Sequence, residues 1–344
     1  MNLSSHPRAI ARILDANLDR AREGLRIIEE WCRFGWQEAK LADRCKQMRQ
    51  ELARWHDPSF RLARDTMGDV GTELSHPQEE SRENIEQLLQ ANICRVQEAL
   101  RVLEEYGKLL NPSMGIAFKK LRYQVYTLES QLLSYGRLVQ LKSASLYLVT
   151  SPSARILEIV EAALKGGLKL VQYRDKNTED YFRLDLAQKL CQLCHQYQAL
   201  FIVNDRVDLA LAVNADGVHL GQQDLPIKMA RQLLGPQCLI GRSTTNPTEM
   251  TKAIVEGADY IGVGPVYSTP TKEGKKATGL DYVRYAQENA AIPWFAIGGI
   301  DAENVGEVIR AGATQVAIVR AIMNADNPTQ VTQNLLQQLS QNYR

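Results

Sequence analysis

Eight short apolar runs, separated by segments of helical periodicity, constrain the fold of this 344-residue chain more than any other feature. Continuous apolar runs are typical of strands buried on both faces of a parallel sheet. Intervening segments such as 156–167 have apolar residues at helical spacing. The repeated order of strand and helix predicts a closed (β/α)8 barrel, the TIM-barrel architecture. The runs fall at 145–150, 168–174, 200–205, 217–220, 238–241, 260–264, 294–298 and 316–319.

An open, doubly wound α/β sheet is the structural alternative to this barrel. Sheets of that class that bind dinucleotides have a G-x-G-x-x-G turn after the first strand. The segment after the first run here is SPSARILE, which contains no glycine. The missing motif favours the closed barrel.

The first 140 residues have a different pattern, in which long helical stretches contain an internal repeat. Residues 16–31 and 91–106 are identical at eight of sixteen positions, at an offset of 75. Both copies have apolar residues at helical spacing, which predicts one buried stripe in each. The stripe positions are Leu18, Ala21, Leu25 and Ile28, and then Ile93, Val96, Leu100 and Leu103. We therefore expect a duplicated all-α domain over 1–140 and the barrel over 141–344, with a seam at 140–145.

The repeat also preserves polar residues, although an amphipathic pattern does not require the same ones. Ion pairs between residues three and four apart explain them, together with shared ancestry. A paired ligand site is the second interpretation, and it is less favoured because charged helix faces are usually solvated. The repeated residues are Asn17, Arg20, Glu23, Arg26, Glu29 and Glu30, and then Asn92, Arg95, Glu98, Arg101, Glu104 and Glu105.

Charge and hydropathy exclude several classes of partner. The chain has 41 Lys and Arg against 40 Asp and Glu, so we expect neither nucleic acid nor a membrane as partner. It has no apolar run of 18 residues and no apolar signal core at its N-terminus, which predicts a cytoplasmic protein. Six cysteines are too few for a disulfide scaffold. We expect small-molecule substrates and leave open whether the chain forms a homo-oligomer.

Cys191, Cys194 and His195 have the C-x-x-C-H spacing of a c-type haem attachment site. Attachment of that kind requires export, and the sequence has no export signal. The surrounding segment 183–198 has helical apolar spacing, so two small residues on a packed helix are the favoured interpretation.

Polar residues gather at the carboxyl ends of the predicted strands, where barrel enzymes have their active sites. Gln172, Arg174 and Lys176 occupy alternate positions at the end of the second run, so an extended chain points all three to one face. Two cations and an amide in one cavity suit a polyanion such as a diphosphate. An ion-paired rim is the alternative.

Two carboxylates end neighbouring runs. Asp205 follows Asn204 at the end of the third run, and Asp224 lies just after the fourth. They either balance the neighbouring cations or hold Mg²⁺, which takes one or two carboxylates together with substrate phosphates. His219, in the fourth run, is either a site residue or a packed, hydrogen-bonded histidine. No Cys and His set at ligand spacing lies at these strand ends, which argues against a structural zinc.

A second set of residues has the properties of a phosphate site. Gly298 and Gly299 end the seventh run and let a phosphate approach backbone amides. The loops after the seventh and eighth strands are the usual phosphate site of such barrels. Further candidates at the ends of the fifth, sixth and eighth runs are Ser243, Thr269, Thr271, Lys272, Val319 and Arg320.

Together these motifs resemble those of the thiamine-phosphate synthase family. The resemblance implies a transferase that joins 4-amino-2-methyl-5-(diphosphooxymethyl)pyrimidine to 4-methyl-5-(2-phosphoethyl)thiazole in thiamine biosynthesis, releasing diphosphate. The matching motifs, all in order, are Gln172-x-Arg174-x-Lys176, Asn204-Asp205, His219-Leu-Gly221-Gln-x-Asp224, Gly241-x-Ser243, Gly264-Pro265 with Thr269-x-Thr271-Lys272, and Ala296-Ile-Gly298-Gly299-Ile300.

The same resemblance implies a role for each matching residue. The metal ligands for one Mg²⁺ would be Asp205 and Asp224. The diphosphate contacts, which are also the expected catalytic residues, would be Arg174, Lys176, Ser243 and Lys272. The residues that orient the pyrimidine would be Gln172 and Asn204, and His219 is a further substrate-binding candidate. The thiazole phosphate would bind at Thr269, Thr271, Gly298, Gly299, Val319 and Arg320.

One position departs from the family pattern. The family usually has serine after the valine or isoleucine that ends the eighth strand, and this chain has Arg320 after Val319. The backbone amide serves a phosphate in either case. The Arg320 side chain either binds the phosphate or forms an ion pair elsewhere.

Residues 1–140 resemble an accessory domain that is fused ahead of this synthase in some bacteria, through LDANLDRAREGLRIIEE and ARDTMGDVGT. The resemblance implies a kinase-like module for hydroxymethylpyrimidine phosphate, although the sequence has no P-loop or kinase signature. The alternative is a thiazole tautomerase on the same barrel, with the helical domain as a dimerisation or partner-binding module. A tautomerase does not need the diphosphate cluster, so the synthase is favoured.

Overall fold

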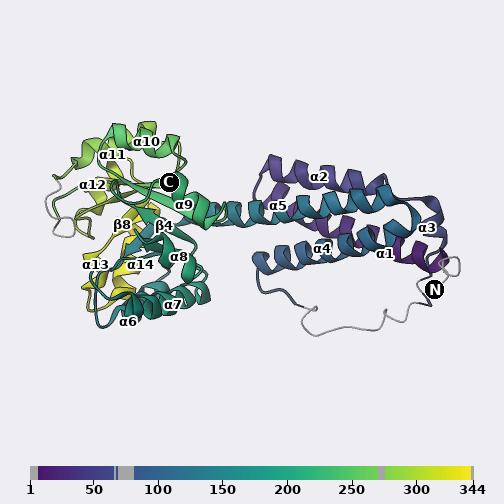
Figure 1. Ribbon diagram of the computed structural model, residues 1–344. Coiled ribbons are helices and arrows are strands. Elements are labelled where there is room, and N and C mark those ends of the chain that lie inside the picture. Colours follow the sequence, from purple (N-terminus) through teal and green to yellow (C-terminus); the bar gives the residue numbers. More distant parts are fainter. Residues whose placement is uncertain (1–6, 66, 69–80, 270–275, 342–344) are drawn as a thin grey trace. The chain divides into compact units, whose positions relative to one another are not determined.

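A computed structural model describes residues 7–65, 67–68, 81–269 and 276–341 of the chain (Figure 1). Two compact units divide between Leu132 and Leu133, inside helix α5 (Pro112–Ser143). The domain boundary expected at 140–145 coincides with the end of α5, whereas the two units divide about ten residues earlier. None of the described helices is long and apolar enough to cross a lipid bilayer.

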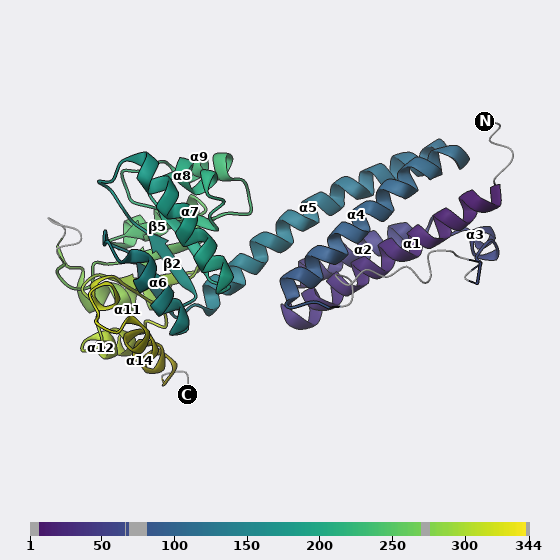
Figure 2. The same cartoon turned by 90° about the horizontal axis from the view of Figure 1, so that it is seen from below.

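In the described residues of the first unit, all regular secondary structure is helical. Within it α1 lies alongside α4 and α2 (Figure 2). The eight stripe positions predicted from the repeat are buried, with at most 2% of their surface exposed, so this prediction is confirmed. Its elements before α5 are α1 (Pro7–Glu30), a π-helix η2 (Trp31–Gly35), α2 (Ala39–Ala53), α3 (Pro58–Leu62) and α4 (Ile85–Leu110).

Several of the repeated polar residues of this unit form equivalent contacts in both copies. Glu29 of α1 is buried and pairs with Arg49 of α2 at 2.5 Å, while Glu104 of α4 is buried and pairs with Arg122 of α5 at 2.9 Å. Each glutamate also pairs with the arginine three residues before it. The repeated asparagines each donate to the carbonyl four residues earlier. Ion pairing therefore explains four of the repeated glutamates, Glu29, Glu30, Glu104 and Glu105.

The second unit is a closed barrel of eight parallel strands in sequence order, in which β1 pairs with both β2 and β8. The predicted (β/α)8 barrel is confirmed. Its strands are β1 (Leu146–Val149), β2 (Leu170–Tyr173), β3 (Leu200–Asn204), β4 (Gly217–Leu220), β5 (Leu239–Thr244), β6 (Tyr260–Val263), β7 (Trp294–Ile297) and β8 (Val316–Ile318). Its helices after α5 are α6 (Ile156–Lys165), α7 (Asp180–Gln196), α8 (Val207–Ala212), α9 (Ile227–Leu234), α10 (Pro247–Val255), α11 (Gly279–Asn289), α12 (Val305–Arg310), α13 (Arg320–Met323) and α14 (Pro328–Ser340).

Asparagine caps explain where several of these helices begin. Asn246 and Asn327 each precede a proline, and each side chain accepts a hydrogen bond from the backbone N–H three residues on. Such caps satisfy a backbone donor that the first turn leaves unpaired, and proline at the first helical position has no donor to satisfy. Local sequence therefore sets the starts of α10 and α14.

Side chains alternate between two layers along each strand, because successive residues of a strand point to opposite faces. Tyr147, Leu170 and Phe295 belong to the cluster inside the barrel. Leu148 and Val171, their neighbours in sequence, pack in the layer between sheet and helices. Polar residues at inward positions near the strand ends are thereby directed into the mouth of the barrel.

The C-x-x-C-H segment lies in α7, as the helical interpretation predicted. Cys191 and Cys194 are buried in the layer between strands and helices. The Nε2 atom of His195 lies 2.9 Å from Oδ2 of the buried Asp216. The hydrogen bond to Asp216, together with a contact to Cys191, raises the pKa of His195 to about 10.

We expect His195→Gln to destabilise the barrel in a pH-dependent way. The pKa of His195 in the folded state lies above its ordinary value of 6.5, so the stabilisation is complete below about pH 6.5 and is lost as the pH rises through about 10. The side chain is 46% exposed, and solvent screening reduces the effect to about 1 kcal/mol. Urea unfolding of both proteins at pH 6 and pH 10 measures it. A difference in unfolding free energy that does not change with pH would contradict the ion pair.

Candidate active site

A pocket at the carboxyl ends of the strands brings together residues predicted for the diphosphate and the pyrimidine. These residues come from β2, β3, β4 and β5 and from the loop after β2. Parallel strands all end at the same rim, which explains why residues far apart in sequence meet here. The predicted residues that line this pocket are Gln172, Arg174, Asn204, His219, Ser243 and Val319.

A second pocket, with a volume of about 290 Å³, adjoins the first and shares Ile297, Ala317 and Val319 with it. Gly298 and Gly299 lie at its wall with φ angles of 108° and 68°, a region that glycine adopts without strain. The backbone therefore approaches this cavity with no side chain in between. The predicted residues that line it are Thr269, Gly298, Gly299, Val319 and Arg320. The predicted Thr271 and Lys272 lie outside the described residues.

Arg320 is the exposed first residue of α13 and lines this second pocket. It forms no ion pair with any other described residue. Of the two interpretations of this side chain, the contacts in the described part of the chain give no support to an ion pair elsewhere.

Lys176 lies at the rim of the first pocket and not in its lining. Its Nζ is 2.8 Å from Oδ2 of Asp205. Asp205 has a φ angle of 61°, and its backbone N–H donates to the carbonyl of His219 at 2.8 Å. An aspartate tolerates this left-handed conformation better than most residues, and such conformations cluster at functional sites. The alternative of an ion-paired rim therefore describes Lys176.

The carboxyl groups of Asp205 and Asp224 lie close enough to shift each other's pKa. Burial opposes the ionisation of Asp205, but the Lys176 ammonium and the contact with Asp224 hold its pKa below the ordinary value. Burial raises the pKa of Asp224, and the adjacent Asp205 raises it further. Two carboxyl groups that resist joint ionisation form a site at which a cation replaces the shared proton.

This donor set fits Mg²⁺. The described residues contain no group of three or more His, Cys, Asp or Glu side chains positioned to hold a metal ion. A structural zinc needs four such ligands, whereas Mg²⁺ is held by one or two carboxylates with substrate phosphates and water. Asp205 and Asp224 supply the two carboxylates, next to the pocket with the predicted diphosphate residues.

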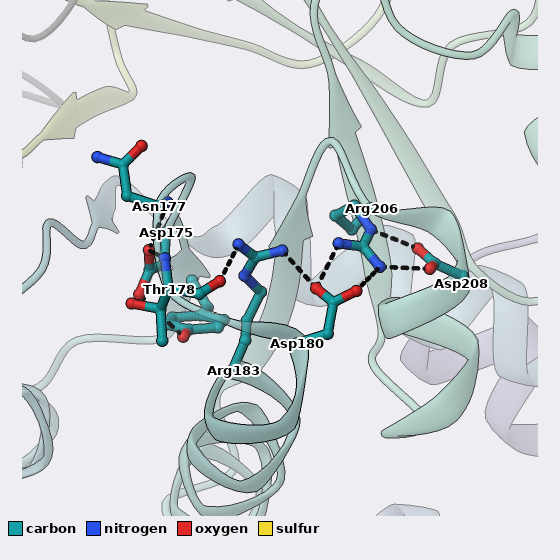
Figure 3. A network of polar contacts seen from close by, with 8 residues as sticks. Asp175, Asn177, Thr178, Asp180, Arg183, Arg206 and Asp208 are labelled. Atoms are coloured by element: carbon teal, nitrogen blue, oxygen red, sulfur yellow. Dashed lines mark hydrogen bonds and ion pairs between the residues drawn. The ribbon is translucent and has the colours of Figure 1, made fainter.

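Hydrogen bonds hold the loop that carries Lys176 (Figure 3). The carboxylate of Asp175 accepts from the backbone N–H groups of Asn177 and Thr178, both at 3.1 Å. The guanidinium of Arg183, on α7, donates to the Thr178 carbonyl. The loop is therefore closed on itself and tied to the following helix.

The same network reaches the loop that carries Asp205. Arg206, the next residue, donates to Asp180 at the start of α7 at 2.7 Å and to Asp208 of α8 at 2.6 Å (Figure 3). Asp180 also accepts from Arg183 at 2.8 Å. One network of ion pairs therefore holds both the loop that carries Lys176 and the loop that carries Asp205.

The structure adds two buried tyrosines that sequence reasoning missed. Tyr147 of β1 and Tyr260 of β6 have hydroxyl oxygens 2.9 Å apart, and both line the first pocket. Gln172 donates to Tyr147 at 2.7 Å, and Tyr260 contacts Nδ1 of His219 at 3.2 Å. The sequence held one signal for these tyrosines: each places a hydroxyl group within an otherwise apolar strand.

Comparison with known proteins agrees with this geometry. A family model described as thiamine monophosphate synthase matches residues 146–322. A thiamine-phosphate synthase from Synechocystis sp. is 68% identical over 334 residues, which cover 97% of each chain. The chain belongs to the thiamine-phosphate synthase family. The resemblance found in its sequence motifs is confirmed.

Further members of the thiamine-phosphate synthase family show how much of the chain is shared. The relative from Gloeobacter violaceus is 53% identical over 331 residues, 96% of this chain and 97% of its own. The solved thiamine phosphate pyrophosphorylase from Pyrococcus furiosus is 36% identical, with a TM-score of 0.54, and covers 58% of this chain and 98% of its own. A second family model, the ThiD2 family, matches residues 12–131. The helical unit is thus shared with full-length relatives.

Proposed function

We propose that residues 141–344 condense the pyrimidine diphosphate with the thiazole phosphate to give thiamine phosphate and diphosphate. The observation that carries the proposal is the pair of adjoining pockets. One has a carboxylate pair and cations at its rim, and the other has a wall of glycine backbone. Two anionic substrates bound side by side meet where the pockets share residues.

The roles of the residues follow from their chemistry. Arg174 offers a planar fork and Lys176 a compact charge to the diphosphate, and the Ser243 hydroxyl adds a hydrogen bond. Gln172 and Asn204 orient the pyrimidine ring. Asp205 and Asp224 would hold Mg²⁺, which neutralises negative charge on the diphosphate oxygens when bound. We expect Lys272 to contact the same diphosphate.

The reaction needs no protein nucleophile. The bond between the pyrimidine methylene carbon and the diphosphate oxygen breaks, and its electron pair leaves with the diphosphate. The aminopyrimidine ring stabilises the positive charge that develops on the methylene carbon. The lone pair of the thiazole nitrogen then forms the new carbon–nitrogen bond. The protein contributes by holding both substrates in line and stabilising the departing charge.

The full-length chain tests this proposal directly. It is incubated with both substrates and Mg²⁺, and thiamine phosphate and diphosphate are measured. We expect equal amounts of the two products. Conversion of the thiazole phosphate in the absence of the pyrimidine diphosphate would instead indicate the tautomerase.

We also propose that the helical unit phosphorylates hydroxymethylpyrimidine phosphate, a reaction that supplies the diphosphate substrate. The match of residues 12–131 to the ThiD2 family supports this second activity. The test uses the full chain with hydroxymethylpyrimidine phosphate, ATP and Mg²⁺, and without the thiazole phosphate, so that the synthase step cannot consume the product. Accumulation of the pyrimidine diphosphate supports the kinase, and none after prolonged incubation supports a dimerisation or partner-binding module.

We expect Arg320→Ala to weaken binding of the thiazole phosphate. The exposed guanidinium lines the phosphate pocket, and a hydrogen bond to a charged group contributes about 1.5–3 kcal/mol. KM for the thiazole phosphate should therefore rise about tenfold or more, with little change in KM for the pyrimidine diphosphate. Steady-state kinetics with each substrate varied in turn measures both. If Arg320→Ala and the natural protein have the same KM for the thiazole phosphate, backbone amides alone hold the phosphate.

A further inference from the structure

One series of hydrogen bonds crosses the interior of the barrel along the lining of the first pocket. Gln172 Nε2 lies 2.7 Å from the Tyr147 hydroxyl, which lies 2.9 Å from the Tyr260 hydroxyl. Tyr260 lies 3.2 Å from Nδ1 of His219, and Nε2 of His219 lies 2.9 Å from Oγ of Ser243. The series links a residue assigned to the pyrimidine with one assigned to the diphosphate.

A glycine makes the contact between Tyr260 and His219 possible. Strand β5 lies between β4 and β6, and Gly241 is in register with both His219 and Tyr260. A Cβ atom at Gly241 would lie 2.2 Å from Cζ of Tyr260 and 2.5 Å from Nδ1 of His219. Any other residue at Gly241 would push the two rings apart. The contact between them therefore depends on the residue that the family motif places here.

The donors and acceptors along the series have one consistent direction. The Gln172 amide nitrogen only donates, so the Tyr147 oxygen accepts from it. We assign the Tyr147 hydrogen to Tyr260, whose hydroxyl lies within hydrogen-bond distance. Burial raises the pKa of both phenols, so each keeps its single hydrogen. The Tyr260 hydrogen then points to Nδ1 of His219.

The hydrogen bond from Tyr260 to His219 also determines which atom donates between His219 and Ser243. With Nδ1 accepting from Tyr260, the ring hydrogen lies on Nε2 and points to Oγ of Ser243. Oγ therefore accepts from His219, and the hydrogen of the hydroxyl points away from the imidazole. A hydroxyl in this state is a donor, which is what a diphosphate oxygen requires.

We propose that Tyr147 and Tyr260 are positioning residues of the synthase. Tyr260 holds His219 as its Nε2–H tautomer and so presents the Ser243 hydroxyl as a donor to the diphosphate, whereas Tyr147 holds Gln172. The proposal rests on the roles of Gln172 and Ser243 given under the proposed function. Neither tyrosine touches the reacting atoms. Tyr147 acts on Gln172 and Tyr260, and Tyr260 acts on Ser243 through His219.

Nitrogen NMR of the full chain tests the tautomer without substrate or turnover. The two ring nitrogens of a neutral histidine have distinct ¹⁵N shifts, and the signals of His219 are assigned among the five histidines by their loss in His219→Gln. We expect the Nε2–H form in the natural protein and in Tyr147→Phe, where Tyr260 still donates to His219. We expect loss of that preference in Tyr260→Phe. An Nδ1–H form in the natural protein overturns the proposal.

Kinetics supply the second readout, with Tyr147→Phe as the matched control. Each Tyr→Phe change removes one buried hydroxyl from the same aromatic cluster. We expect Tyr260→Phe to lower kcat about tenfold, the effect of one hydrogen bond to a charged group. Tyr147→Phe should instead raise KM for the pyrimidine diphosphate severalfold, because Gln172 loses its acceptor.

A double-mutant cycle separates positioning from a purely structural role. If Tyr260 acts through Ser243, Tyr260→Phe costs little more once Ser243→Ala is present. Effects on kcat that multiply independently overturn the proposal. If the natural protein forms thiamine phosphate but His219 has the Nδ1–H tautomer, only the positioning role is rejected. If the natural protein forms no thiamine phosphate, the synthase assignment itself is rejected.

Discussion

Lys176→Met is expected to lower kcat/KM for thiamine phosphate formation by about 100- to 1,000-fold, the usual effect of removing one preorganised group that stabilises developing charge. The ammonium is fixed 2.8 Å from Asp205 at the rim of the diphosphate pocket. In its proposed role it stabilises the departing diphosphate more than the bound substrate, because the charge grows as the bond breaks. The loss should therefore appear mainly in kcat. Steady-state kinetics with saturating thiazole phosphate measures it.

Lys189→Met is the matched control for this variant. Both lysines have side chains that are 55% exposed, and Lys189 pairs with Asp185 at 2.6 Å on α7. We expect the control to keep full activity, and both variants to change the free energy of unfolding by less than about 0.5 kcal/mol. Equal activity of Lys176→Met and the natural protein would reject the placement of the diphosphate.

Asp224→Asn is expected to have an effect of similar size, through the metal. The change removes one of two carboxylates while keeping an oxygen that accepts from the backbone N–H of Gly221, a bond of 2.6 Å in the natural protein. The loop geometry is therefore retained. We expect kcat to fall about 100-fold, close to 2.7 kcal/mol, and the Mg²⁺ concentration for half-maximal activity to rise.

The metal dependence separates a role in Mg²⁺ binding from charge balance. Titration of Mg²⁺ at fixed substrate concentrations gives the activation curve of each variant. Asp185→Asn, which removes an exposed carboxylate from the helix α7, should give the curve of the natural protein. A lower kcat with an unchanged Mg²⁺ curve would mean that Asp224 only balances the neighbouring cations.

The architecture of both units was predictable because its signals are local. Each apolar run after residue 143 became a strand of the barrel, since residues buried on both faces are apolar whatever their neighbours. The stripe at Leu18, Ala21, Leu25 and Ile28 marks a helix because its spacing matches the helical turn. Neither inference needs to know which elements lie side by side.

The general position of the site was predictable for a related reason. Parallel strands in a barrel all end at one rim, so polar residues at strand ends converge once the barrel is recognised. Gln172, Arg174, Asn204, His219 and Ser243 accordingly line one pocket. Their individual partners were not predictable, because these depend on strand register and loop geometry. The pairing of Lys176 with Asp205 is an example.

The sequence by itself determined the order of elements, the closed barrel, the duplicated helical unit and the residues that gather at the rim. Only the tertiary structure decided which of these residues hold each other in place. Tyr147 and Tyr260 are 113 positions apart and looked like ordinary core residues. They meet inside the barrel because its strands close in register and Gly241 leaves room between them. Such contacts depend on distances across the sheet, which no local pattern encodes.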